Sequence, residues 1–168
     1  TPRTLFPYTT LFRSSLALNV GAMLLAFIAL VALVNAIIAF FGGLFGMPQL
    51  SLGWILGRVF SPLAFVMGIP TQDILTAGNL FGTKVVLNEF VAYAEFAKIM
   101  NTLNPKTVMI LTYALCGFAN ISSIGIQIGG IGGLAPEKRK DIASLGVKAL
   151  VGGLLTTCLT GTIAGILM

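Results

Sequence analysis

A small set of polar side chains with ligand-binding chemistry lies inside long apolar segments of this sequence. Glu89 is one of them. Asn120, Ser123 and Gln127 are spaced i, i+3 and i+7, which places them on one face of a helix. A carboxylate accepts hydrogen bonds and an amide both donates and accepts, so these side chains can bind a polar ligand. Because an ionisable side chain at membrane depth is energetically costly, ligand binding is our first interpretation of Glu89.

Structural interpretations stay open for the same residues. Glu89 could instead form an ion pair with Lys84 or Lys98, which would hold the local fold without touching a ligand. Asn120 and Ser123 could form hydrogen bonds between helices, as polar side chains in membrane proteins do.

Several kinds of chemistry are excluded by the composition. The sequence has no histidine, so a Ser-His-Asp triad and an imidazole metal site are both ruled out. Cys116 and Cys158 do not form a CxxC pair, and we expect buried small side chains rather than a thiolate metal site or a redox pair. The stretch 130–135 imitates a dinucleotide-binding motif, but no predicted strand precedes it. We therefore predict no catalytic residue, no metal site and no cofactor, in a protein that is not an enzyme.

The overall composition sets the fold class. Hydrophobic residues make up 57% and charged residues 9% of the chain, whereas about 25% of residues are charged in an average soluble domain. A bilayer core of about 30 Å requires roughly 20 apolar helical residues, and several stretches reach that length. The sequence therefore predicts an all-α membrane protein with three transmembrane helices, at about 16–41, 107–134 and 142–168.

Local patterns add detail to the last two spans. Asn104-Pro105 is expected to open the second span, because asparagine caps a helix and proline is favourable at its first position. Residues 118–123 interrupt the apolar pattern of that span, and the glycines that follow allow close helix approach or local unwinding. Gly161 and Gly165 in the third span form a small-xxx-small pattern suited to helix packing.

Two shorter segments complete this topology. Residues 50–68 carry Trp54 and Arg58 between prolines, a pattern typical of an interfacial helix that lies along the membrane surface. The loop 136–141 holds the densest cationic cluster of the chain. The positive-inside rule therefore places this loop in the cytoplasm and the C-terminus on the outer side.

Residues 71–103 have a different character, because they are apolar and yet carry several ionisable side chains. One straight helix would bury these charges in lipid, whereas two half-helices that fold back near 78–84 reach the midplane and return. We therefore predict a re-entrant hairpin with a polar site at its tip. Lys84 and Asn88 are expected to support that tip.

The N-terminal segment is not expected to belong to this fold. Thr4 to Ser14 reads TLFPYTTLFRS, which resembles the in-frame translation of a sequencing-library adapter. We therefore interpret 1–14 as a non-native segment and 15–168 as a fragment of a longer protein. Arg3 and Arg13 fall in the excluded segment, so the net charge of +5 gives little reason to expect a nucleic-acid partner.

Two motifs resemble those of the concentrative nucleoside transporters. The first, GTKVVLNEFVAY from Gly82 to Tyr93, has a glycine, a lysine two positions on, and then Asn-Glu-Phe-Val-Ala and an aromatic residue. The second, CGFANISSIGIQIGGIGGLAP from Cys116 to Pro136, is similar to the family's penultimate helix. The resemblance covers 15–168 as a nucleoside transporter C-terminal domain, and it implies the C-terminal half of an inverted-repeat transporter.

The resemblance also implies a function, which is secondary active uptake of nucleosides across the inner membrane, coupled to sodium or protons. In such families a hairpin-bearing transport domain moves by alternating access against a fixed scaffold, within a homotrimer surrounded by membrane lipid. The scaffold would include the helix at 16–41, and the mobile domain would include 71–103 and 107–134.

The family's site residues carry over by motif position. Glu89 and Asn120 would hold ribose hydroxyls. Ser123 would add a ribose contact, and Phe118 would pack near the nucleoside, with plain packing as the alternative for Phe118. The family's other hairpin, which contacts the base and helps to bind sodium, would lie before residue 15, so this chain supplies half of the substrate site and little of the ion site.

The alternative function is a structural subunit or a membrane transporter for another substrate. A purely structural subunit needs no acidic hairpin tip, and Glu89 disfavours anionic substrates such as dicarboxylates. A nucleoside therefore fits the sequence better.

Overall fold

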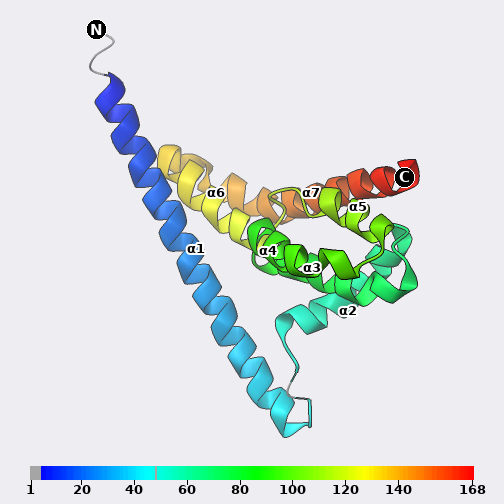
Figure 1. Cartoon of the computed structure of the whole chain (residues 1–168). Coiled ribbons are helices and arrows are strands. Elements are labelled where there is room, and N and C mark those ends of the chain that lie inside the picture. Colours follow the sequence, from blue (N-terminus) through cyan, green and yellow to red (C-terminus); the bar gives the residue numbers. More distant parts are fainter. Residues whose placement is uncertain (1–4, 48) are drawn as a thin grey trace.

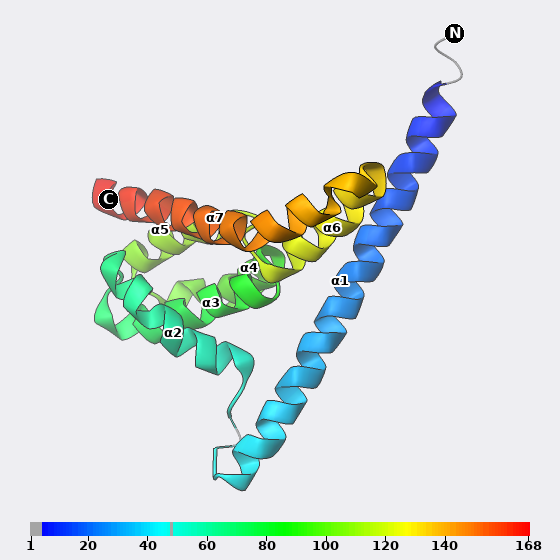
Figure 2. The same cartoon turned by 180° about the vertical axis from the view of Figure 1, so that it is seen from behind.

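The computed structural model describes residues 5–47 and 49–168, and within them every regular element is helical (Figures 1 and 2). One long helix, α1, runs past a group formed by the remaining helices, and the C-terminus lies on the side of that group away from α1. The helices are α1 (Leu5–Leu44), α2 (Leu52–Val66), α3 (Ile74–Val86), α4 (Glu89–Ile99), α5 (Pro105–Ala114), α6 (Ile121–Leu134) and α7 (Arg139–Leu167), with short 3-10 turns at Thr71–Asp73, Met100–Thr102 and Pro136–Lys138.

Helix α1 has the length and the surface of a membrane-spanning helix. Its segment Leu25–Leu44 and the segment Pro136–Leu167 are the two helical stretches among the described residues that are long and apolar enough to cross a bilayer. The side chain of Asn35 accepts a hydrogen bond from the Leu52 N–H at 2.8 Å, which joins α1 to the start of α2. Of the segment 1–14, residues 1–4 lie outside the described part of the chain.

Helices α2 and α3 pack closely through glycines, and we call this contact the α2–α3 seam. It is formed by Gly57, Gly78 and Gly82. A Cβ added at Gly78 would collide with the carbonyl oxygen of Gly57, and one added at Gly82 would lie 2.9 Å from the Cβ of Leu56. Glycine is therefore required here, because any side chain would push the two backbones apart.

The chain reverses between α3 and α4 at Leu87 and Asn88, not near 78–84 as the glycines suggested. Asn88 is extended, with φ −168°, and its side chain accepts a hydrogen bond from the Val91 N–H. An asparagine in this position is a favourable N-cap, so it starts α4 directly after the reversal. The Thr83 hydroxyl donates to the Glu95 carboxylate at 3.1 Å, which joins the two arms of the hairpin.

The predicted span at 107–134 is divided in the structure, at the place where its apolar pattern is interrupted. Helix α5 ends at Ala114, a break follows, and α6 starts after Asn120. Within this break, which we define as 115–120, Gly117 has φ +140°, a conformation that side-chain-bearing residues rarely adopt. The predicted start of α5 is confirmed, since Asn104 caps it and Pro105 is its first residue.

Helix α7 closes the group by packing along α5 and α6 (Figure 2). A Cβ at Gly161 would lie 2.7 Å from the carbonyl oxygen of Ile110, and one at Gly165 would lie 2.5 Å from the Ile110 side chain. The predicted use of this small-xxx-small pattern for helix packing is therefore confirmed. The core between α3, α5 and α7 contains the fully buried side chains Phe81, Ile110, Leu111 and Leu115.

Candidate functional site

The site is built where two helix N-termini meet. Helix α4 starts at Glu89 behind its cap Asn88, and α6 starts at Ile121 behind its cap Asn120. The Asn120 Nδ2 donates to the Glu89 carboxylate at 2.9 Å, and we call this contact the α4–α6 junction. The positive ends of both helix dipoles lie at this junction, where they favour a negative charge. A carboxylate in this place is therefore stabilised by both helix N-termini.

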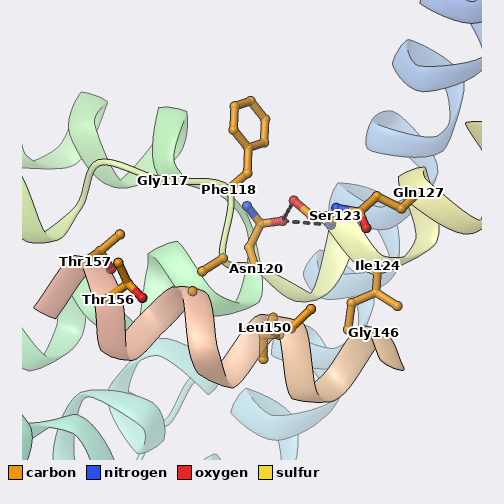
Figure 3. Close-up of a pocket in the computed structure, with 13 residues that line it drawn as sticks. Gly117, Phe118, Asn120, Ser123, Ile124, Gln127, Gly146, Leu150, Thr156 and Thr157 are labelled. Atoms are coloured by element: carbon orange, nitrogen blue, oxygen red, sulfur yellow. Dashed lines mark hydrogen bonds between the residues drawn. The ribbon is translucent and has the colours of Figure 1, made fainter. Parts of the chain in front are cut away.

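Asn120 is held in one orientation by its own helix. Its Oδ1 accepts hydrogen bonds from the Ser123 N–H at 2.8 Å and from the Ser123 hydroxyl at 2.7 Å (Figure 3). With only 1% of its surface exposed, the Asn120 side chain has little freedom to turn. Its Nδ2 is thereby directed at Glu89. The sequence placed Asn120 on a helix face, whereas the structure makes it the N-cap.

Ser122 belongs to the same cluster and was missed by the sequence analysis. Its hydroxyl lies 2.7 Å from the Oδ1 of Asn120 and 3.0 Å from the carbonyl oxygen of Leu87 at the hairpin reversal. Ser122 therefore joins the reversal to the start of α6. Its proximity in sequence to two predicted site residues was the available signal.

Lys84 is buried and joins α3 to α5 and α7. Its side chain is 0% exposed, and its Nζ donates to the carbonyl oxygen of Ala114 at 2.7 Å and to the Thr157 hydroxyl at 2.9 Å. Within the described part of the chain, Glu89 makes no ion pair with Lys84 or Lys98. Glu89 is instead bound by Asn120.

Phe118 lies on the break next to Asn120, and its ring points away from α7 (Figure 3). The side chain is 77% exposed, so it is not used to pack the core of this chain. A large aromatic surface beside a polar junction is available for contact with a ligand.

An open cavity of about 360 Å³ lies beside the break, between α6 and α7. Ligand sites commonly have volumes of roughly 300 to 1,000 Å³. Among the described residues, no three His, Cys, Asp or Glu side chains come together. The cavity combines polar groups of the break and α6 with small and polar residues of α7: Asn120, Ser123, Gln127, Gly146, Gly153, Thr156 and Thr157. Thr156 and Thr157 were not predicted, although a pair of threonines in an apolar span is a visible signal.

The sequence matches one protein family and is similar to several transporters. A family model described as "Na+ dependent nucleoside transporter C-terminus" matches residues 8–165. This match begins within the segment 1–14 that we interpreted as non-native. An uncharacterized transporter, YutK of Bacillus subtilis, is 54% identical over 150 residues, which cover 89% of this chain and 37% of that protein. The nucleoside permease NupC of Helicobacter pylori is 46% identical over 157 residues, which cover 90% of this chain and 38% of that protein. Solute carrier family 28 member 3 of Homo sapiens is 40% identical over 168 aligned positions, which cover 91% of this chain and 24% of that protein.

Solved structures agree with these similarities. A single-substitution variant of CNTnw in an intermediate state has a TM-score of 0.86 at 50% sequence identity, and the match covers 92% of this chain and 39% of that chain. CNTnw in an inward-facing substrate-bound state has a TM-score of 0.78 at 49% identity, with 90% and 38% covered. The chain thus spans less than two fifths of the length of the proteins it matches.

Proposed function

The chain belongs to the family of Na+-dependent nucleoside transporters, as its C-terminal part, and from that premise we propose that it supplies half of the substrate site of a nucleoside transporter. The whole protein would take up nucleosides across the inner membrane together with sodium or protons. The coupling-ion site would lie mostly outside these residues.

The observation that carries this proposal is the α4–α6 junction. The Asn120 Nδ2 donates to the Glu89 carboxylate at 2.9 Å. The carboxylate can accept bonds from two vicinal hydroxyls, and the amide can donate to a hydroxyl oxygen. A ribose could therefore replace the contact between them without leaving either group unsatisfied. An anionic ligand would instead meet the charge of Glu89.

Ser123 and Phe118 complete the proposed ribose and base contacts. The Ser123 hydroxyl is buried beside Asn120 and lines the cavity. Phe118 offers an exposed ring next to the same break, where a nucleobase could stack on it. Lys84 and Asn88 act behind the site and do not contact the substrate in this proposal.

The proposed membrane arrangement follows from helix length and charge. Helices α3 and α4, with 13 and 11 residues, rise roughly 20 Å and 16 Å, so neither crosses a core of about 30 Å, which is consistent with a re-entrant hairpin. In this arrangement α1 and α7 span the bilayer and α2 lies along its surface, with Arg58 stacked 3.4 Å above the Trp54 ring. The loop 136–141 would face the cytoplasm and the C-terminus the outside.

The complete transporter would be a homotrimer that works by alternating access. Helix α1 would belong to the fixed scaffold, since its apolar surface is largely exposed in this chain, as at Leu25 (70%) and Phe40 (68%). The hairpin and the broken helix α5–α6 would belong to the moving domain. Their contacts with each other at Glu89, Asn120 and Ser122 support movement as one body.

The test is Glu89→Gln in the complete transporter, with affinities measured for uridine and its 2′-deoxy and 3′-deoxy analogues. Loss of a charged hydrogen bond, worth about 1.5 to 3 kcal/mol, should weaken uridine binding roughly ten-fold or more. The analogue that lacks the hydroxyl contacted by Glu89 should lose less affinity on Glu89→Gln, because it does not form that hydrogen bond in the unsubstituted transporter.

The matched control is Glu95→Gln, which changes an exposed acid on the same helix that is bound by Thr83. It should leave uridine affinity within about two-fold, since exposed hydrogen bonds contribute little. Equal losses for all analogues with Glu89→Gln, at normal expression, would make Glu89 a structural residue and remove the ribose assignment.

A further inference from the structure

Helix α3 has a buried ionisable side chain at each end. Asp73, which immediately precedes α3, is 6% exposed, and Lys84 near its other end is 0% exposed. A buried charge is costly unless hydrogen bonds or opposite charge compensate it. Neither residue forms an ion pair with another described residue. Their compensation must come from other groups.

Both residues are compensated by the same neighbour, helix α5. The carboxylate of Asp73 accepts from the Asn104 N–H at 2.9 Å and from the Thr107 hydroxyl at 2.6 Å, at the N-terminal end of α5. Lys84 donates to the carbonyl oxygen of Ala114, the last residue of α5. The Asp73 carboxylate thus lies at the positive end of the α5 dipole, and the Lys84 ammonium lies at its negative end. Helix α5 is held at both ends by α3.

The two ends of α5 have different surroundings. The Asp73 end lies at the base of the hairpin. The Lys84 end lies where α5 stops and the break 115–120 begins. The last carbonyl groups of a helix lack partners within it, and Lys84 provides one for Ala114.

Lys84 also fixes this end of α5 against α7. Its second acceptor is the Thr157 hydroxyl, which itself donates to the carbonyl oxygen of Leu154. The Thr157 methyl group lies 2.7 Å from the position that a Cβ at Gly117 would occupy. The first half of the break is therefore confined by the residue that Lys84 binds.

The geometry assigns Lys84 a positioning role for the substrate site. By holding the end of α5 on α7, it sets the path of the break 115–120, and so the place where the Asn120 amide meets Glu89. Asp73 holds the remote end of α5 and secures the fold without affecting the site. The assignment rests on the proposed nucleoside function, because its readout is nucleoside affinity.

The experiment compares Lys84→Met with Asp73→Asn in the complete transporter, with uridine affinity measured by calorimetry and stability by thermal unfolding. Both variants remove a buried charge that α3 or its preceding turn presents to α5, so both should lower the unfolding temperature. Lys84→Met should also weaken uridine binding at least ten-fold, whereas Asp73→Asn should leave it within about two-fold. Similar affinity losses for the two variants, or wild-type affinity with Lys84→Met, would overturn the role.

A double-mutant cycle with Asn120→Ala separates positioning from general stability. If Lys84 acts through Asn120, adding Lys84→Met to Asn120→Ala should weaken binding by less than about two-fold more. Losses that multiply would show that Lys84 does not act through Asn120. If Lys84→Met does not fold, Thr157→Val serves as the second variant, because it removes one of the two hydrogen-bond partners of Lys84. It should weaken uridine binding about three-fold or more. Unchanged uridine affinity in Thr157→Val would contradict the positioning role.

The same set of variants distinguishes this inference from the proposed function. Wild-type uridine affinity in Asn120→Ala would overturn the ribose assignment, and the positioning role with it. Weakened binding in Asn120→Ala together with wild-type binding in Lys84→Met and Thr157→Val would overturn the positioning role alone.

Discussion

The α2–α3 seam and the α4–α6 junction both bring two helices together, but they use opposite chemistry. In the seam, glycines bring the backbones so close that a Cβ at Gly78 would collide with Gly57. At the junction, the contact is a side-chain hydrogen bond between Asn120 and Glu89. A ligand can replace a hydrogen bond with its own, but it cannot replace a close backbone contact. The seam is therefore suited to keep the hairpin in place, and the junction to exchange partners.

The largest expected effect is on the seam. Gly78→Leu should destabilise the complete transporter by about 3 kcal/mol or more, because the new side chain meets backbone atoms that cannot move away. Thermal unfolding in detergent measures the loss. The matched control is Gly43→Leu on α1, where no atom lies within 4 Å of the added Cβ. Equal stability of the two variants would refute the seam as a close contact.

The next effect compares the two asparagine caps. Asn120→Ala should weaken uridine binding by about 2 kcal/mol, roughly 30-fold, because the amide that faces Glu89 is lost. Asn88→Ala should cost about 1 kcal/mol of stability, as for other N-caps, with an affinity loss below about five-fold. Calorimetry and thermal unfolding separate the two. If Asn88→Ala weakened binding as much as Asn120→Ala, capping and not ligand contact would explain both.

The smallest effect is expected at Ser122. Ser122→Ala removes the contact between the start of α6 and the carbonyl oxygen of Leu87, a hydrogen bond worth about 1 kcal/mol. Uridine affinity should fall roughly five-fold, with equal losses for uridine and its deoxy analogues, since Ser122 holds the junction and does not touch the sugar. A loss that depended on the sugar hydroxyls would instead make Ser122 a ligand contact.

The sequence predicted those features that depend on neighbouring residues. The family, the all-helical fold, the Asn104-Pro105 helix start and the Gly161–Gly165 packing pattern are confirmed. Each depends on a local signal, such as a cap, an apolar length or a motif. The family resemblance placed Glu89 and Asn120 in one site, but it did not predict the direct hydrogen bond between them.

The features that were misplaced depend on tertiary contacts. Gly78 and Gly82 indicated a turn, but their lack of side chains serves the contact with α2, which the sequence of the hairpin does not show. Asn120 was placed on a helix face by its spacing, and local unwinding was allowed nearby, but the full break with Gly117 at φ +140° and Asn120 as the N-cap was not predicted. The partners of Lys84 on α5 and α7 could not be predicted, because they come from distant parts of the chain.

The break between α5 and α6 has a practical consequence through its cysteine. Both cysteines were expected to be buried, but Cys116 lies in the break and is exposed. Cys158, the other of the two cysteines of the chain, is 4% exposed, as expected. A thiol-reactive fluorophore should therefore label Cys116 first, without any engineered substitution. Because Asn120 caps the helix that follows the same break, the emission of such a label offers an optical signal for ligand arrival at the junction.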